Sequence, residues 1–241
     1  MTKVRSVLCI LSGEPQIMTE HLLVKPTPWD TVAFGIPTWE LTEYSKKALE
    51  QSMQKYGHYT LKVDPLADKR LLHEFGFYYC DTLIEPHCNA SILSEARHPE
   101  ATISRNINAE QVLPICHGAF VYGRFHRDFN LPKVFADLRY DNWLKQLLDA
   151  KNVYGLYWQA ALAGFIGYSG NNLVLHAVEE KYRGKGLSKY WWSMVCNELL
   201  ASGHHEVKSS ISTTNIAVLN LYSSLGFKFR NPQDVYHRMT M

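Results

Sequence analysis

The sequence lacks any apolar run as long as the roughly 18 residues that a membrane-spanning helix needs, so no transmembrane helix is expected. Its first residues offer only the apolar run 7–11, which is too short for the core of a signal peptide. No small-residue cleavage site follows that run. These absences predict a cytoplasmic protein that does not enter a membrane.

An excess of charge of one sign is also missing. The 25 Lys and Arg residues nearly balance the 23 Asp and Glu residues, and no long basic block stands out. A nucleic-acid partner is therefore not expected. The five cysteines are an odd, scattered set without a C-x-x-C pair. Because disulfide frameworks use even numbers and zinc sites use close pairs, we expect reduced thiols and no metal.

The clearest signals lie towards the C-terminus. Ser188 is a candidate N-cap for a helix that Gly203 ends, and Asn215 can cap a second helix. Apolar periodicity predicts the following order of elements: a strand at 173–178, a charged loop with two glycines at 179–186, a helix at 189–201, a strand at 206–212, a helix from 215 and a strand from 226.

The first half of the chain repeats this order more faintly. The segment Leu71–Phe77 lines up with Leu221–Phe227, and both end in Gly-Phe. Leu72 stands where the second segment has Tyr222, and the first half has no glycine loop. The repeat predicts two related α/β halves, the first of which has lost its working parts. A chance match of one short signature is the alternative.

These patterns divide the chain into a degenerate N-terminal domain at 1–89, a linker or mobile loop at 90–111 and a catalytic domain at 112–241. In the first domain we expect strands at 37–41, 59–63 and 78–84 and helices at 44–55 and 67–74. In the second we expect a helix at 135–148 and a hairpin at 153–169 that turns near Ala163-Gly164.

The loop Arg183–Ser188 lies between a strand and a helix, a place that favours an anion. Unpaired backbone N–H groups and the positive end of the helix dipole attract negative charge there. Gly184 and Gly186 let the backbone approach a diphosphate, and Arg183 and Lys185 add positive charge. A purely structural turn is the alternative, since the spacing fits neither a P-loop nor the dinucleotide-binding glycine pattern.

The surrounding order is more specific than the loop. Val178 stands five residues before Arg183, and Asn215 is followed seven residues later by Tyr222 and then by Leu225-Gly226-Phe227. Over residues 150–241 this arrangement resembles the two signatures of the GNAT superfamily of N-acetyltransferases. The resemblance implies a mixed α/β GNAT fold with mostly antiparallel sheets, in tandem if the first half is a degenerate copy. Ser188 departs from the family, which has Gly or Ala there.

The resemblance also implies roles for individual residues, with acetyl-CoA as co-substrate and no metal. The backbone of the loop, including Leu187, would hold the CoA diphosphate, and an N–H near Ala177 or Val178 would polarise the thioester carbonyl. Asn215 would contact the cofactor from the other side of the cleft. Tyr222 would protonate the departing CoA thiolate as general acid. A core tyrosine is the alternative.

A general base is harder to assign. The attacking amine must be neutral, and a water chain can bring a weakly basic amine to that state. His176 and Glu179 lie near the acceptor end of the strand. His176 shares a face with apolar residues, so a core histidine competes with a substrate contact, and the base stays unassigned.

The whole chain indicates a substrate class. Trp29–Gly35, the silent first half and Arg124–Asp128 resemble, over residues 28–241, the acetyltransferases of dTDP-fucosamine and related nucleotide sugars. The implied acceptor is the amino group of a dTDP- or UDP-amino sugar. Arg124 and Arg127 would meet its negative charge, although ordinary surface roles are as plausible for both. Trp29 and Phe34 are core candidates first and stacking groups second.

Two other functions stay open. A GNAT enzyme could acetylate a different small amine, such as a drug or a polyamine, or a protein N-terminus. A non-catalytic acyl-CoA-binding module would bind the cofactor without turnover, but Tyr222 and the glycine loop argue against it. The sequence leaves open the choice between acetyl and longer acyl groups and the oligomeric state, with a homodimer among the options.

Overall fold

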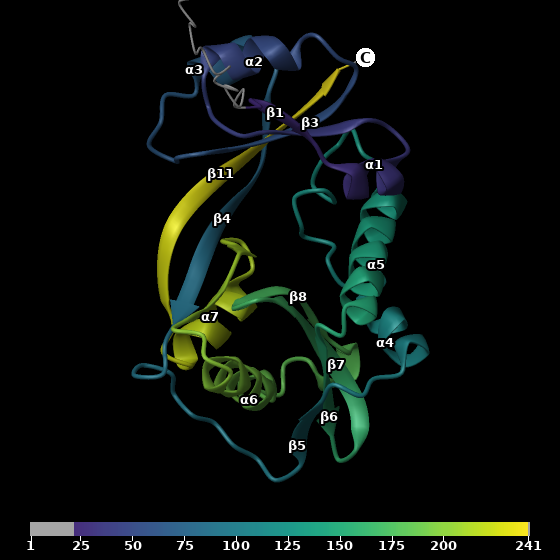
Figure 1. Ribbon diagram of the computed structural model, residues 1–241, viewed down its shortest axis with the longest axis vertical. Helices are drawn as coiled ribbons and strands as arrows, with labels where there is room; N and C mark the ends of the chain where they lie inside the picture. Colours follow the sequence, from purple (N-terminus) through teal and green to yellow (C-terminus); the bar gives the residue numbers. More distant parts are fainter. Residues whose placement is uncertain (1–21, 241) are drawn as a thin grey trace, which may run out of the picture.

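Residues 22–240 are the part of the chain that the computed structural model describes (Figure 1). The apolar run 7–11, Cys9 and the start of the first predicted domain lie outside the described residues. No helix between residues 22 and 240 is long and apolar enough to cross a membrane.

The first half alternates strands and helices as its sequence predicts. Ser45 caps one helix by accepting a hydrogen bond from the Ala48 N–H, and Gly35 ends another in the left-handed conformation. The elements are β1 (Val24–Pro26), α1 (Pro28–Phe34), β2 (Thr38–Leu41), α2 (Lys46–Ser52), β3 (Gly57–Val63), α3 (Arg70–Glu74) and β4 (Tyr78–Cys88).

The second half confirms the predicted order of strand, loop, helix, strand, helix and strand. Its elements are β5 (Ala101–Ser104), α4 (Ala109–Cys116), α5 (Lys133–Asp149), β6 (Val153–Trp158), β7 (Ala161–Ser169), β8 (Asn172–Val178), the 3₁₀ turn η1 (Glu180–Tyr182), α6 (Ser188–Ala201), β9 (Val207–Ser209), β10 (Ile211–Ser212), α7 (Ile216–Ser224) and β11 (Lys228–Thr240).

Besides β1, α1 and α4, which the sequence did not predict, three details differ from the predictions. The hairpin turns at Gln159 and Ala160, both with positive φ, and not near Ala163-Gly164. The stretch 90–111 is more than a linker, because β5 lies within it and pairs with β6, as in Ala101 opposite Trp158. Ser188 is the first helical residue of α6 and does not cap it with its side chain.

The strands form one 11-stranded sheet with the order β1-β2-β3-β11-β4-β9-β8-β7-β6-β5, and β10 pairs with β4 beside this path. β11 lies between β3 and β4, two strands of the first half, and β4 lies between β11 and β9, two strands of the second half. The two long strands therefore make an antiparallel ribbon that joins the upper and lower parts of the molecule (Figure 1).

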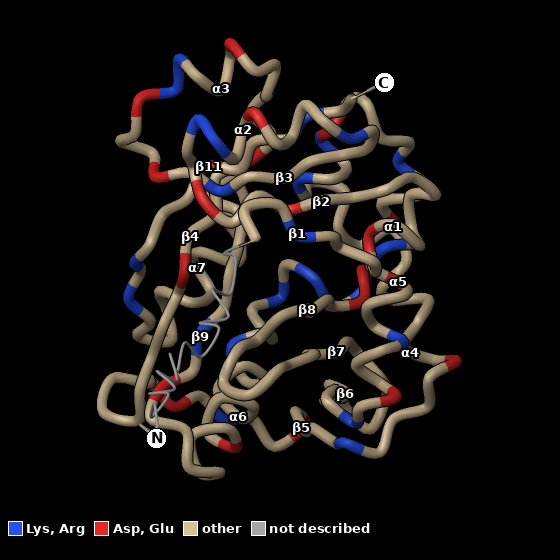
Figure 2. Tube along the Cα trace, turned by 45° about the horizontal axis from the view of Figure 1, so that its top comes forward, with Lys and Arg blue, Asp and Glu red and all other residues tan. Residues whose placement is uncertain are grey.

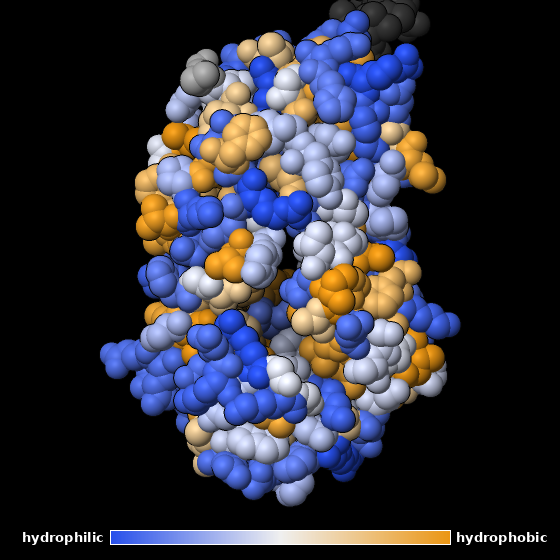
Figure 3. Space-filling view, turned by 180° about the vertical axis from the view of Figure 1, so that it is seen from behind, coloured by the Kyte–Doolittle hydropathy of each residue, from blue (hydrophilic) through white to orange (hydrophobic). Residues whose placement is uncertain are grey.

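Helices pack on both faces of the sheet. In the second half α6 and α7 pack on one face, with Trp191, Trp192 and Tyr222 in the core that they share with the strands. α4 and α5 cover the other face, where Leu144 packs near Leu175. In the first half α2 and α3 share a separate core with β3. Acidic and basic residues are interspersed over the trace (Figure 2), and a hollow opens near the middle of the face seen from behind (Figure 3).

Candidate active site

The loop after β8 is open and exposed, as an anion-binding loop must be. Gly184 and Gly186 have φ values of 72° and 71°, a conformation that other residues adopt at a cost, and no atom lies within 4 Å of a Cβ built on either. Lys185 is exposed beside them. The Arg183 side chain turns back, and its Nε donates to the carbonyl of Val178 over 2.7 Å. Arg183 therefore holds the loop against the end of β8.

The start of α6 keeps its backbone donors available. Leu187 occupies the N-cap position without a side-chain hydrogen bond, and Ser188 follows as the first helical residue. An uncapped helix start leaves N–H groups of the first turn without intrahelical partners, and the helix dipole adds positive potential there. The geometry suits a phosphate group at this position.

β8 has an open edge beside this loop. It pairs with β9 only at Asn172 and Leu173, while its pairing with β7 continues to Val178. A register shift in that pairing leaves Val174 as an extra residue in β8. From this bulge onward the edge that faces away from β7 has no strand beside it among the described elements. An extended ligand can pair with such an edge.

The register identifies which backbone groups face the open edge. The Glu179 N–H donates to the carbonyl of Ala163, on the β7 side. Because the hydrogen-bonding direction alternates along a strand, the N–H groups of Val178 and His176 point to the opposite, open side, and that of Ala177 points to β7. Of the two residues that the sequence left as donors to the thioester carbonyl, Val178 therefore has the suitable direction.

Tyr222 lies behind this edge, on α7. Its side chain is completely buried, and its hydroxyl oxygen is 3.4 Å from Nε2 of His176, a weak contact. Burial raises the pKa of Tyr222 above the ordinary value of a phenol, an effect that Ser209 and Trp192 partly offset. Burial also lowers the pKa of His176 to about 4. Near neutral pH the tyrosine thus keeps its proton and the histidine is uncharged.

The pKa shifts bear on the roles of this pair. The Tyr222 hydroxyl keeps a proton that it can donate, but its raised pKa makes it a weaker acid than an ordinary phenol. An imidazole with a pKa near 4 accepts protons poorly, so His176 is a weak base. Trp192 packs edge-on against His176 at 5.0 Å, and its indole Nε1 is buried without a partner in the described part of the chain. A donor is therefore still available beside the tyrosine.

The remaining candidates are spread over several places. Asn215 caps α7 through its side-chain oxygen, which accepts a hydrogen bond from the Val218 N–H over 3.3 Å. Its side chain is exposed. The Glu179 carboxylate pairs with Lys181 at 2.9 Å. Phe34 is buried, with its ring 5.3 Å from that of Phe125, so it is a core residue.

The two arginines proposed for the substrate differ in environment. Arg127 pairs with the buried carboxylate of Asp81 over 3.0 Å. Arg124 is half-buried and lines a cavity to which Trp29 also contributes. The structure thus brings Arg124 and Trp29 together and ties Arg127 to a partner that the sequence did not reveal.

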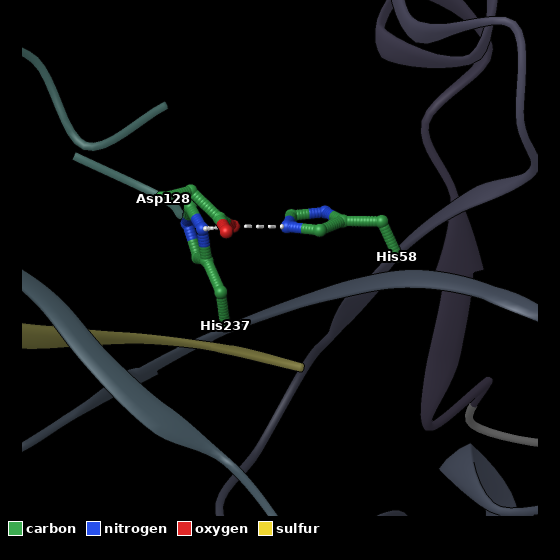
Figure 4. A group of neighbouring side chains, drawn as sticks. All are labelled: His58, Asp128 and His237. Atoms are coloured by element: carbon green, nitrogen blue, oxygen red, sulfur yellow. Dashed lines mark hydrogen bonds and ion pairs between the residues drawn. The ribbon is translucent and has the colours of Figure 1, made fainter. Parts of the chain in front are cut away.

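A buried polar cluster escaped sequence analysis. Asp128 accepts hydrogen bonds on Oδ2 from His58 Nε2 at 2.9 Å and from His237 Nδ1 at 2.7 Å (Figure 4). The Tyr78 hydroxyl and the Asn130 N–H complete the set of donors. These side chains come from β3, β4, β11 and the segment before α5, so only the folded chain brings them together. The cluster could be read as a metal site, but both ring nitrogens point at the carboxylate as hydrogen-bond donors.

A family model described as "Acetyltransferase (GNAT) domain" matches residues 119–239. The chain belongs to the GNAT acetyltransferase family and is an N-acetyltransferase. Members of this family use acetyl-CoA.

Solved structures share this fold at low sequence identity. A GCN5-related N-acetyltransferase from Sphaerobacter thermophilus has a TM-score of 0.61 and 9% identity, with 90% of this chain and 76% of that one covered. A tandem GNAT protein from the clavulanic acid biosynthesis pathway has a TM-score of 0.52 and 13% identity (85% and 76% covered). A glucosamine N-acetyltransferase region of a fungal multi-domain β-N-acetylglucosaminidase has 0.52 and 13% (84% and 30% covered). No curated protein matches the chain.

Proposed function

We propose that this chain transfers an acetyl group from acetyl-CoA directly to the amino group of a nucleotide-linked amino sugar, with Tyr222 as general acid. The observation that carries the proposal is the open edge of β8 with the protonated Tyr222 hydroxyl behind it. The open loop at Gly184 and Gly186 and the uncapped start of α6 fit a diphosphate, and the unpaired edge of β8 fits the pantetheine arm.

The residues divide the work as follows. Acetyl-CoA supplies the acetyl thioester. Backbone N–H groups of Arg183–Ser188 hold the diphosphate, and the Val178 N–H stabilises negative charge on the thioester oxygen while the amine nitrogen bonds to the carbonyl carbon. The carbon–sulfur bond then breaks, and Tyr222 gives its proton to the departing thiolate. The amine loses its extra proton to water, since no residue is assigned as base, and water returns a proton to the Tyr222 phenolate.

We also propose that the chain is a tandem of two GNAT-like halves, at 1–89 and 112–241. The strand order supports this, because each half receives one long strand of the other in an equivalent place. β11 separates β3 from β4, just as β4 separates β9 from β11. In both halves the inserted strand thus lies between the last two strands of a strand-helix-strand-helix-strand unit.

The amino-sugar acceptor rests on weaker support than acetyl transfer. The fungal structural neighbour acts on glucosamine, so this fold accommodates an amino-sugar acceptor in another protein. Other amines, and binding of acyl-CoA without turnover, remain the competing functions. The cytoplasmic location and a homodimer stay predictions.

The test is a thiol-release assay with acetyl-CoA and a panel of dTDP- and UDP-amino sugars. Tyr222→Phe removes only the hydroxyl and should lower kcat by about a hundredfold. Tyr59→Phe removes another buried hydroxyl, which donates to the Lys55 carbonyl in the first half, and should leave kcat unchanged. Equal rates in both variants would eliminate the general-acid role. Turnover of other amines alone would reject the sugar acceptor.

A further inference from the structure

A cavity of about 370 Å³ lies between α1, the strands β2 and β3, and α5. Small-molecule sites occupy roughly 300–1,000 Å³, so the cavity can hold a small ligand or one part of a larger one. α1 packs against the upper end of α5 (Figure 1). None of the residues assigned to the acetyl-CoA loop or to Tyr222 lines it.

Its charges are unbalanced. Three cations and two anions line the cavity, and two of the cations are already paired. Lys62 faces Glu40 at 3.7 Å, and Arg139 Nε donates to Asp30 over 2.6 Å. Among the described residues the Arg124 guanidinium has no ion pair. It lies instead over the neighbouring Phe125 ring, at 4.8 Å.

The environment of Arg124 disfavours its own charge. Burial and the nearby Arg139 lower the pKa of Arg124, an effect that Tyr140, Asp30 and Glu40 partly offset, and an arginine stays protonated at every physiological pH. A half-buried cation next to a second cation gains stability when an anion binds, because a charge-assisted hydrogen bond replaces lost hydration. The guanidinium fork suits a phosphate or a carboxylate.

The rest of the lining suits a ring. Trp29, with 51% of its surface exposed, and Trp143 both line the cavity, as do the amide residues Asn142 and Gln146. Indoles bind sugar and base rings by stacking, and amides read polar substituents. Trp143 and Val174 of β8 pack against the same core cluster. The cavity is therefore lined in part by α5, the helix that packs over β8.

We infer that this cavity binds the anionic, ring-bearing part of the acceptor, with Arg124 as its anion-binding residue. The inference rests on the proposed function and gives the first half, which has no glycine loop, a working role as the acceptor-binding wall. The amino group of the acceptor would then extend from the cavity along α5 towards β8.

The test uses dTDP, which has a diphosphate and a ring but no amine to acetylate. Calorimetric titration should show dTDP binding to the wild-type chain, and Arg124→Gln should weaken it about tenfold or more. Arg124→Lys keeps the charge without the fork and should fall in between. Arg70→Gln is the matched control, because Arg70 is an exposed arginine on α3 that pairs with Asp68. It should bind dTDP like the wild type.

Two results would overturn the inference: wild-type protein that does not bind dTDP, or Arg124→Gln that binds as tightly as Arg70→Gln. Acetyl-CoA titrated into the same proteins judges the proposed function separately and also reports whether each variant is folded. If acetyl-CoA binds and dTDP does not, only the cavity assignment fails. If acetyl-CoA does not bind the wild type, the proposed acetyl transfer fails whatever dTDP does.

Discussion

Asp128→Asn should destabilise the protein far more than a change of one atom suggests. The Asp128 carboxylate is 2% exposed and accepts four hydrogen bonds, from His58, His237, the Tyr78 hydroxyl and the Asn130 N–H. Although burial alone would raise the pKa of Asp128, the hydrogen bonds from His237 and His58 hold it well below the ordinary value. The folded state therefore contains a stable buried carboxylate.

An asparagine keeps one accepting oxygen and presents an NH₂ group where the other oxygen was. At least one N–H or O–H donor then meets a donor, and the remaining bonds lose their ionic partner. Two bonds to a charged group at about 1.5–3 kcal/mol each give a loss of about 3–6 kcal/mol. For a chain of this size the melting temperature should fall on the order of 10 °C.

The assay is thermal and urea unfolding followed by circular dichroism. Tyr78→Phe removes one donor and leaves the carboxylate, so it should cost about 1–2 kcal/mol. Asp68→Asn is the matched control, because that carboxylate is 57% exposed and pairs only with Arg70 on the surface. It should change stability by at most about 0.5 kcal/mol. If Asp128→Asn and Asp68→Asn have the same melting temperature, the hydrogen-bonded cluster does not have the stabilising role derived from its geometry.

Two further changes test the loop and the buried histidine. Gly186→Ala places a side chain at φ 71° and should raise the KM for acetyl-CoA about tenfold. Gly203→Ala, at φ 101° beyond α6, introduces similar backbone strain and should leave that KM unchanged. Equal KM values for the two variants would contradict the diphosphate site. Burial lowers the pKa of His237 to about 3, so an unfolded histidine takes up a proton below about pH 6.5 while the folded one does not. The free energy of unfolding should therefore fall by up to about 1.4 kcal/mol per pH unit below about pH 6. Urea titrations at several pH values measure this dependence. If the free energy of unfolding of His237→Gln falls with pH as steeply as that of the wild type, the role of His237 is refuted.

The sequence predicted the elements from β8 onward because each is a local pattern. The glycine loop, the Asn215 cap and the apolar run of β8 all depend on residues that are neighbours in the chain. The turn at Gln159 and Ala160 was missed because neither residue type favours positive φ, so no local signal marked it. The capping role of Ser188 was wrong by one position, which backbone geometry alone decides.

The other features of the site depend on contacts between residues that are far apart in the sequence. Tyr222 was predicted from its offset to Asn215, but its contact with His176 spans 46 residues and could not be read from spacing. The Asp128 cluster joins residues 70 and 109 positions apart. Among the described residues, the lack of an ion pair at Arg124 and the pairing of Arg127 with Asp81 likewise appear only when the two halves are assembled.

The exchange of β4 and β11 has a consequence for how the protein is made. The Gly57 N–H at the start of β3 finds its partner, the Thr240 hydroxyl, 183 residues later in the chain. During synthesis the edges of β3 and β4 that pair with β11 in the folded protein therefore stay without that partner until the last strand of the chain emerges. Such edges recruit other chains, and pairings of this sequence separation form slowly. Each half takes one long strand from the other, so neither half can complete its part of the sheet alone.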